Sequence, residues 1–298
     1  MTSADERPAR LDVGVVGAGR VGAVLGAALQ RVGHRVLAVS GVSEESRDRA
    51  ARLLPGTPVL PPDEVVRRAE LVVLAVPDDA LADLVAGLSA TRTWQAGQLV
   101  AHTSGRHGLE VYASALDQHV LGLALHPAMT FTGTGIDLDR LVECCFGVTA
   151  PEPLRPVAEA LVLEIGAEPV WIEESARGLY HAALAHGANH LVTLIAQSLQ
   201  ALRAAGVESP ARVLGPLVSA ALDNALRAGD AALTGPVARG DAGTVAEHLR
   251  QLQSLTPDIR PTYVALARAT AERALASGRL KPHVAEPLLD ILATDQER

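Results

Sequence analysis

Short apolar runs and amphipathic segments alternate along the first 172 residues of the chain. The amphipathic segments 62–70 and 154–165 have helical spacing. The apolar runs have the length and β-branched composition of buried strands, and lie at 13–16, 34–40, 71–76, 98–102, 120–125, 146–149 and 169–172. Strands alternating with helices predict an α/β fold with a parallel, doubly wound sheet.

The pattern changes at Glu174, after which no strand-like run follows. Only helical segments remain, at 175–205, 211–228, 242–254, 261–277 and 283–293. We therefore expect two domains, residues 1–173 around the sheet and an all-α domain of residues 174–298. Since no Gly/Ser linker separates them, we expect tight packing and a cleft at the carboxyl edge of the sheet.

The segment 178–202 contains no Asp, Glu, Lys or Arg and is long enough to span a bilayer. Its three histidines, Asn189 and two glutamines are too many polar groups for lipid. We interpret it as a helix buried inside the protein, so no membrane association is expected.

A glycine-rich sequence follows the first apolar run and opens a helical segment, reading Gly17-Ala18-Gly19-Arg20-Val21-Gly22. Strand, G-x-G-x-x-G and helix in this order are the dinucleotide-binding fingerprint of a Rossmann domain. The alternative is a purely structural glycine turn. The fingerprint predicts that residues 1–173 bind NAD(P), with the pyrophosphate at the start of the helix.

The end of the second strand indicates which dinucleotide is bound. NAD-dependent enzymes usually carry an Asp or Glu there, but this chain has Ser40 followed by Ser43 and Arg47. These residues suit a 2′-phosphate, so NADP is favoured over NAD, although two adjacent glutamates oppose it and Arg47 is alternatively a solvated helix residue. The cofactor-binding candidates are Gly17, Gly19, Arg20, Val21, Gly22, Ser40, Ser43, Arg47 and, after the strand 71–76, Val76 and Pro77.

Catalytic candidates follow two later strands and lie on the uncharged segment. Ser104 could polarise a substrate or merely cap the chain that follows, and His126 could donate a proton or merely bond nearby backbone. His181 and Asn189, eight residues apart, lie on roughly one helix face. His186 and His190 have zinc-helix spacing, but no third ligand is evident, so no metal is predicted.

Composition excludes other classes of protein. The net charge of −8, with basic residues scattered along the chain, argues against nucleic acid as a partner. The two cysteines are adjacent and the N-terminal segment is polar, which predicts a cytoplasmic protein without a signal peptide. Lys281 is the only lysine, so any lysine-dependent mechanism would require it.

The sequence 233–241, LTGPVARGD, is a glycine- and proline-containing loop between helices. It offers Thr234 and Arg239 to a substrate carboxylate or phosphate. Alternatively it is ordinary helix punctuation, with Asp241 as an N-cap.

The motifs GAGRVG, LAVPDD, HTSG, HPAMTF, YHAALAHGAN and LTGPVARGD, in this order, resemble Rossmann-like bacterial oxidoreductases with a C-terminal helical domain of unknown function. More distantly the chain is similar to pyrroline-5-carboxylate reductases, ketopantoate reductases and β-hydroxyacid dehydrogenases. The resemblance implies a small-molecule substrate and a homodimer formed through the helical domain.

The chain departs from these distant relatives at one position. Ketopantoate reductases and β-hydroxyacid dehydrogenases have a catalytic lysine four residues before an asparagine, and if Asn189 is that asparagine, Ala185 replaces the lysine. Our hypothesis is an NADP-dependent reductase of the C=O or C=N of a small carboxylate-bearing metabolite, with ketopantoate as the concrete candidate. His181 is the first and His126 the second proton donor, while Asn189 and Ser104 polarise the substrate. The alternatives are a non-catalytic dinucleotide sensor or assembly protein and, less favoured, a methyltransferase.

Overall fold

The computed structural model describes residues 10–294. The polar N-terminal segment, on which the cytoplasmic prediction depends, lies outside the described residues except for Arg10. The chain forms two compact units that divide between Gly187 and Ala188. The last strand ends at Trp171 and, up to residue 294, only helices follow, while the first unit also includes the first helix after the sheet.

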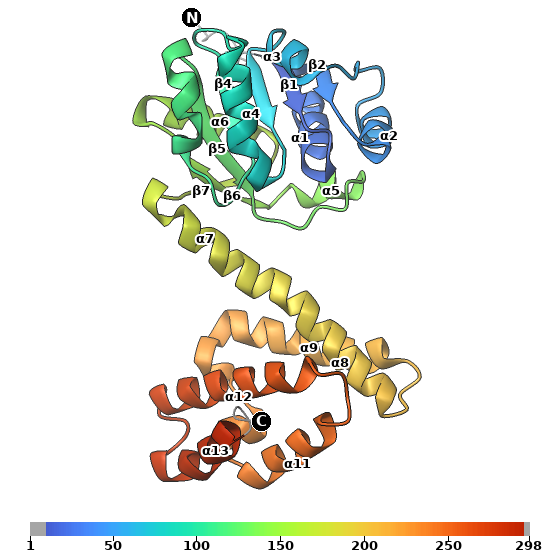
Figure 1. Ribbon diagram of the computed structural model, residues 1–298, viewed down its shortest axis with the longest axis vertical. Coiled ribbons are helices and arrows are strands. Elements are labelled where there is room, and N and C mark those ends of the chain that lie inside the picture. The colour runs from blue at the N-terminus through green and yellow to red at the C-terminus, as the bar shows by residue number, and fades with distance from the viewer. Residues whose placement is uncertain (1–9, 295–298) are drawn as a thin grey trace, which may run out of the picture. The chain divides into compact units, whose positions relative to one another are not determined.

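The first unit is built on a seven-stranded sheet (Figure 1). Its central strands are buried on both faces because helices cover both sides. The order is β2-β1-β3-β4-β5-β6-β7, with β1 (Asp12–Val16), β2 (Arg35–Ser40), β3 (Leu71–Leu74), β4 (Leu99–His102), β5 (Leu121–Pro127), β6 (Cys145–Thr149) and β7 (Glu168–Trp171).

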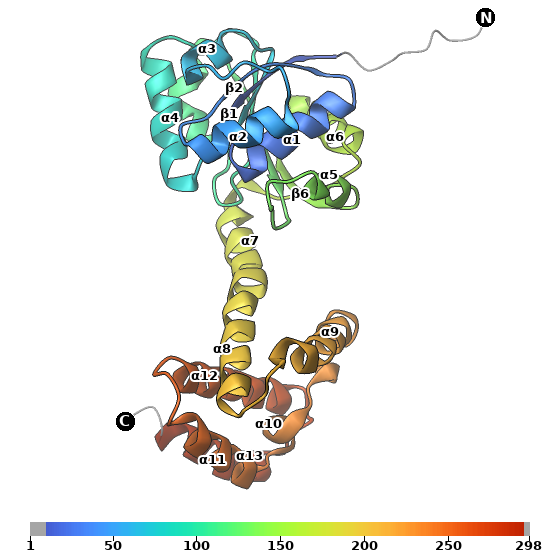
Figure 2. The ribbon, with the colours of Figure 1, turned by 90° about the vertical axis from the view of Figure 1, so that its right-hand side faces the viewer.

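Two hydrophobic layers flank this sheet, and Figure 2 shows α1 and α6 on one side and α4 on the other. One layer joins Val13 and Val15 of β1 to α1 (Arg20–Arg31), α2 (Glu44–Leu53), α5 (Ile136–Arg140) and α6 (Arg155–Glu164). The other joins Val16 to α3 (Pro62–Val66), α4 (Asp78–Ala90) and the 3₁₀ segment η1 (Leu109–Gln118). The predicted doubly wound α/β fold is confirmed.

The expectation that all strands run parallel is wrong at one pairing, because β6 lies antiparallel to β5. A parallel return needs a long crossover, usually a helix. Residues 128–144 contain only the five-residue α5, so the chain turns back beside β5. β7 then pairs parallel to β6, and these two strands run opposite to the other five.

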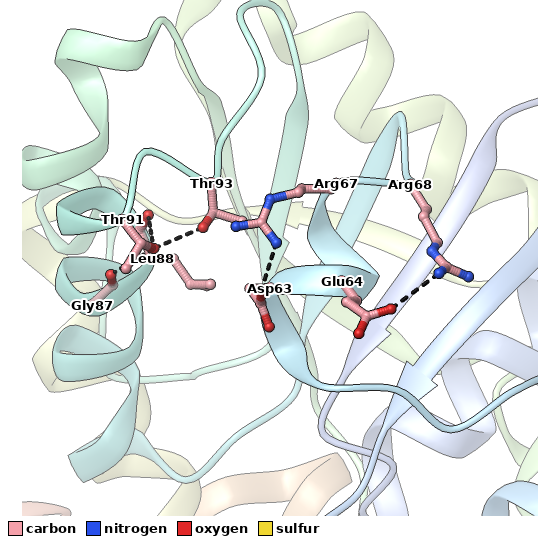
Figure 3. A network of polar contacts seen from close by, with 8 residues as sticks. All are labelled: Asp63, Glu64, Arg67, Arg68, Gly87, Leu88, Thr91 and Thr93. Atoms are coloured by element: carbon pink, nitrogen blue, oxygen red, sulfur yellow. Dashed lines mark hydrogen bonds and ion pairs between the residues drawn. The ribbon is translucent and has the colours of Figure 1, made fainter.

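Surface contacts hold the ends of two helices on the α3–α4 side of the sheet (Figure 3). On α3, Arg67 pairs with Asp63 and Arg68 with Glu64. At the end of α4, the Thr91 hydroxyl bonds to carbonyls of the last turn. Exposed helical ion pairs contribute roughly 0.3–0.5 kcal/mol each, so packing of the layer supplies most of the stability here.

The segment 175–205, predicted as one helix, is interrupted by one wider turn. After the short η3 (Glu174–Ala176), the chain forms α7 (Arg177–Leu184), a π-helical turn (Ala185–Asn189) and α8 (His190–Ala204). The expectation that this segment is buried is wrong for the single chain, since Leu179 and Val192 are 77% and 70% exposed. Leu179 and Val192 are therefore largely exposed to solvent in the single chain.

The second unit is all-α, as predicted, with its core formed by its last four helices. The core residues come from α10 (Gly235–Arg239), α11 (Ala242–Leu252), α12 (Ile259–Ala276) and α13 (Pro282–Thr294). By contrast α9 (Pro210–Ala228) buries only Pro210. No helix within residues 10–294 is both long and apolar enough to cross a membrane.

Candidate functional site

The three glycines of the fingerprint are placed differently. Gly17 has φ +100°, and a Cβ on it would lie 2.5 Å from the carbonyl oxygen of Ala75. A Cβ on Gly22 would collide with the carbonyl oxygen of Gly17. A Cβ on Gly19, in contrast, would have no atom within 4 Å. Gly17 and Gly22 are therefore required by packing, whereas Gly19 faces open space.

Gly19 is also the N-cap of α1, and no side chain caps this helix. The first amide groups of α1, at Arg20 and Val21, therefore have no intrahelical acceptor. Uncapped amides and the positive end of the helix dipole attract a phosphate group. The geometry is that of a phosphate cradle.

Ser40, at the end of β2, holds the glycine turn in place. Its hydroxyl accepts a hydrogen bond of 3.0 Å from the Gly17 amide, and its carbonyl accepts one of 2.6 Å from the Ala18 amide. Val76 lies against the same turn, 3.3 Å from the position of a Gly17 Cβ, and Pro77 precedes α4 as its N-cap.

Ser43 and Arg47 lie at the start of α2. The Ser43 hydroxyl caps this helix by accepting from the Ser46 amide. Arg47 donates to the Val42 carbonyl at 2.7 Å, so its guanidinium lies over the loop that follows β2.

Sequence reasoning missed Arg49, one helical turn beyond Ser46. Arg49 donates to the Ala18 carbonyl at 3.3 Å, and its buried Nε has no hydrogen-bond partner. It thus supports the glycine loop from α2. No motif in the sequence distinguished it from the other arginines of α2.

A cluster of aromatic side chains lies where β5 ends. His126 Nδ1 lies 2.9 Å from the hydroxyl oxygen of Tyr180, and the His126 and His181 rings are 6.2 Å apart, edge to face. Gly147 leaves room for Tyr180, since a Cβ there would lie 2.5 Å from its hydroxyl oxygen. The structure thus brings together two of the predicted catalytic residues and adds Tyr180, which sequence reasoning missed.

Burial is the main reason why both His126 and Tyr180 are uncharged at neutral pH. Burial first, then the charges of Arg177 and His181, lower the pKa of His126 to about 4. Burial raises the pKa of Tyr180. At neutral pH the His126 imidazole and the Tyr180 phenol are therefore both neutral.

Ser104 follows β4 and is buried. Its hydroxyl accepts hydrogen bonds from the amides of Arg106 and His107, at 3.2 and 3.1 Å. These hydrogen bonds agree with the alternative in which Ser104 caps the chain that follows it. Its carbonyl oxygen accepts from Arg177, a buried arginine that sequence reasoning did not single out.

The remaining candidates belong to the second unit. Asn189 is the last residue of the π-helical turn and is exposed. Thr234 and Arg239 are exposed at the two ends of α10, and Asp241 caps α11, as the punctuation alternative proposed. Within residues 10–294, no group of three or more His, Cys, Asp or Glu side chains is placed to hold a metal ion.

Family models match the chain in two parts. A Rossmann-like domain matches residues 1–127, and the domain of unknown function DUF2520 matches residues 144–270. The chain is thus similar to Rossmann-like proteins and to proteins that carry a DUF2520 domain, in agreement with the resemblance based on its motifs. A search of the curated proteins finds no match.

Solved structures share the fold at low sequence identity. A Bacteroides fragilis protein described as an NADP oxidoreductase is 24% identical with a TM-score of 0.76, over 88% of this chain and 98% of that one. A Myxococcus stipitatus imine reductase in complex with NADP⁺ is 18% identical with a TM-score of 0.63, over 90% and 95%. A Plasmodium falciparum pyrroline carboxylate reductase with NADP bound is 12% identical with a TM-score of 0.57, over 92% and 98%.

Proposed function

We propose that this protein is an NADP-dependent oxidoreductase that reduces the C=O or C=N bond of a small carboxylate-bearing metabolite. The observation that carries the proposal is the glycine turn, in which Gly17 and Gly22 are packed and Gly19 alone faces open space. A bound ligand gives a reason for the missing side chain at Gly19, and the uncapped start of α1 suits a phosphate.

Structures that share the fold support the choice of cofactor and reaction. The imine reductase and the pyrroline carboxylate reductase both hold NADP, and both names describe reductases. For this chain, Ser43, Arg47 and the loop after β2 are the proposed contacts of the 2′-phosphate, since the Arg47 guanidinium lies over that loop. Bound NADPH would supply the hydride.

The proposed proton donor is His181, with the His126–Tyr180 pair beside it. Because the pKa of His126 is about 4, this imidazole is neutral and orients Tyr180 through Nδ1 better than it donates a proton as imidazolium. Tyr180 keeps its proton at neutral pH, and its hydroxyl oxygen lies 2.9 Å from His126 Nδ1. Ser104, Asn189, Thr234 and Arg239 remain the proposed residues that polarise or bind the substrate.

The experiment is NADPH oxidation, followed at 340 nm, with ketopantoate or a cyclic imine as substrate. We expect turnover with one of these substrates and a loss of at least about a hundredfold in kcat for His181→Ala. Unchanged turnover in His181→Ala would remove His181 from this role.

A non-catalytic dinucleotide sensor or assembly protein is the second candidate, because Ala185 would replace the lysine of the distant relatives if Asn189 corresponds to their asparagine. NADPH binding without turnover on any keto acid or imine would favour the sensor. Binding of S-adenosylmethionine in place of NADPH would instead favour a methyltransferase.

We also propose that the helical unit forms a homodimer through α9. This 19-residue helix buries only Pro210 within its own chain, and Leu217 and Leu226 are 67% and 80% exposed. A helix of this length is about 28 Å long and needs a partner for its apolar face. A second copy offers the same face, as a twofold interface requires.

A further inference from the structure

The loop between β4 and η1, residues 103–108, is tied at both ends to the segment that begins α7. At its far end, the Glu174 carboxylate accepts hydrogen bonds from the amides of Leu109 and Glu110, at 2.9 and 3.2 Å. Gly108 packs so closely on this carboxylate that any side chain there would collide with it. Glu174 thereby satisfies two amides at the start of η1, and its charge strengthens both bonds.

The second tie is Arg177, whose side chain is 1% exposed. Its guanidinium donates to the Ser104 carbonyl at 2.6 Å and to the Thr149 hydroxyl at 2.9 Å, and its Nε is buried without a partner. A buried charge is costly without a paired opposite charge, and both of these acceptors are neutral. The negative charges of Glu174 and Asp78 offset part of this cost.

Gly105 lies between the two ties and against both histidines. A Cβ on Gly105 would lie 2.8 Å from Cδ2 of His181 and 2.9 Å from Nε2 of His126. Any movement of this loop therefore changes the packing of both imidazole rings.

From these contacts we infer that Glu174 and Arg177 are positioning residues, which together hold the 103–108 loop against His126 and His181. The inference rests on the proposed function only in taking the two histidines as groups that act on substrate. The two side chains act through the loop and the rings, and neither needs to touch substrate.

The charge of Arg177 has a second effect on His126. The groups that face this imidazole are Arg177, Tyr180 and His181 from α7 and Asp78 from α4. Burial and Arg177 favour the neutral ring, and only Asp78 opposes them. Arg177 therefore holds the loop and, after burial, is the main reason why the ring that the loop contacts stays neutral.

Hydrogen exchange of the full chain tests the Glu174 tie without cofactor or substrate. Glu174→Gln replaces an acceptor oxygen by a donor that faces amide hydrogens, so we expect exchange of residues 103–110 to accelerate about tenfold. Glu173→Gln is the matched control, because Glu173 is the exposed neighbour and the substitution removes the same charge. Equal exchange in the two variants would overturn the role of Glu174.

The Arg177 tie is tested by titrating His126 with NMR in the wild type, Arg177→Lys and Arg177→Gln. We expect the pKa of His126 to rise by about one unit in Arg177→Gln and to stay low in Arg177→Lys, which keeps the charge. An unchanged pKa in Arg177→Gln would refute the role of this charge. Neither readout depends on turnover, so a protein that reduces no ketone or imine could still confirm both ties.

Discussion

The hydroxyl of Ser40 accepts a hydrogen bond of 3.0 Å from the amide of Gly17, so the end of β2 holds the turn that ends β1. Ser40→Ala would leave a part-buried amide without an acceptor, which costs about 1–3 kcal/mol of unfolding free energy. We expect the substitution to weaken NADPH and NADH to the same extent, because the turn serves both. Thermal unfolding and fluorescence titration measure these effects. A loss confined to NADPH would instead place Ser40 at the 2′-phosphate.

Gly19 and Gly22 should respond differently to alanine. Gly22→Ala drives a Cβ into the Gly17 carbonyl, so we expect a severe loss of stability. Gly19→Ala places its methyl group in open space, so stability should change by less than about 1 kcal/mol. We expect Gly19→Ala nevertheless to weaken dinucleotide binding at least about tenfold, measured by calorimetry. Unchanged binding in a folded Gly19→Ala variant would show that the cradle holds no pyrophosphate.

Arg47 and Arg49 provide a test of cofactor preference on one helix. Arg47→Met should raise the Kd for NADPH about tenfold and leave that for NADH unchanged, since only NADPH carries the 2′-phosphate. Arg49→Met removes the donor to the Ala18 carbonyl and should weaken both dinucleotides alike. Parallel titrations of the two variants decide between these roles. If Arg47→Met binds both dinucleotides as the wild type does, Arg47 does not contact the 2′-phosphate and is a solvated helix residue.

Acid should destabilise the first unit through His102. Burial lowers the pKa of this side chain from 6.5 to about 3, and Nε2 donates to the Gly108 carbonyl at 3.0 Å while Nδ1 accepts from the Ser104 amide. Between about pH 6.5 and pH 3, His102 is therefore protonated in the unfolded chain but neutral in the folded protein. The unfolding free energy should therefore fall by roughly 2–3 kcal/mol between pH 6.5 and 4.5 from this residue alone.

Denaturant unfolding of the wild type and His102→Gln at these two pH values measures the effect. The substitution removes the titrating group, so its pH dependence should be shallower than that of the wild type. Identical slopes would show that His102 does not titrate in this way.

The dimer prediction is tested on α9. Leu217→Asp should convert a dimer into a monomer in light scattering, because a carboxylate within an apolar interface loses its hydration. Leu116→Asp is the control, since Leu116 is 60% exposed on η1 of the first unit. A wild-type chain that is monomeric at high concentration would end this proposal.

The strands were predictable because their signals are local. The apolar run 71–76 contains β3 (Leu71–Leu74), and the glycine fingerprint places the turn at Gly17, where φ is positive. Periodicity could not show the direction of β6, because a run of four or five apolar residues reads the same in either direction. Periodicity also could not show whether the segment 178–202 is covered by its own chain, because apolar composition does not distinguish burial within one chain from burial between chains.

The candidate site was predictable only in part. His126 and His181 were chosen because they are polar residues near strand ends and on an uncharged helix, and the structure brings their rings together. Tyr180 and Arg177 gave no such signal, because their importance depends on the strand register that places Gly147 and Thr149 beside them. Buried arginine is rare, so sequence alone gave no reason to place one here.

The reversal of β6 places Thr149 where Arg177, on the helix that carries Tyr180 and His181, contacts it. Thr149 pairs with Ala124, which pairs with His102, so the last residue of β6 lies level with the end of β4. The chain reaches α7 only after the α6 crossover and β7, and Arg177 of α7 then donates to both the Thr149 hydroxyl and the Ser104 carbonyl. An insertion of a single residue inside β6 would turn Thr149 to the opposite face and separate its hydroxyl from Arg177. An insertion between Pro127 and Cys145, where the strands are merely connected, would leave that alignment intact.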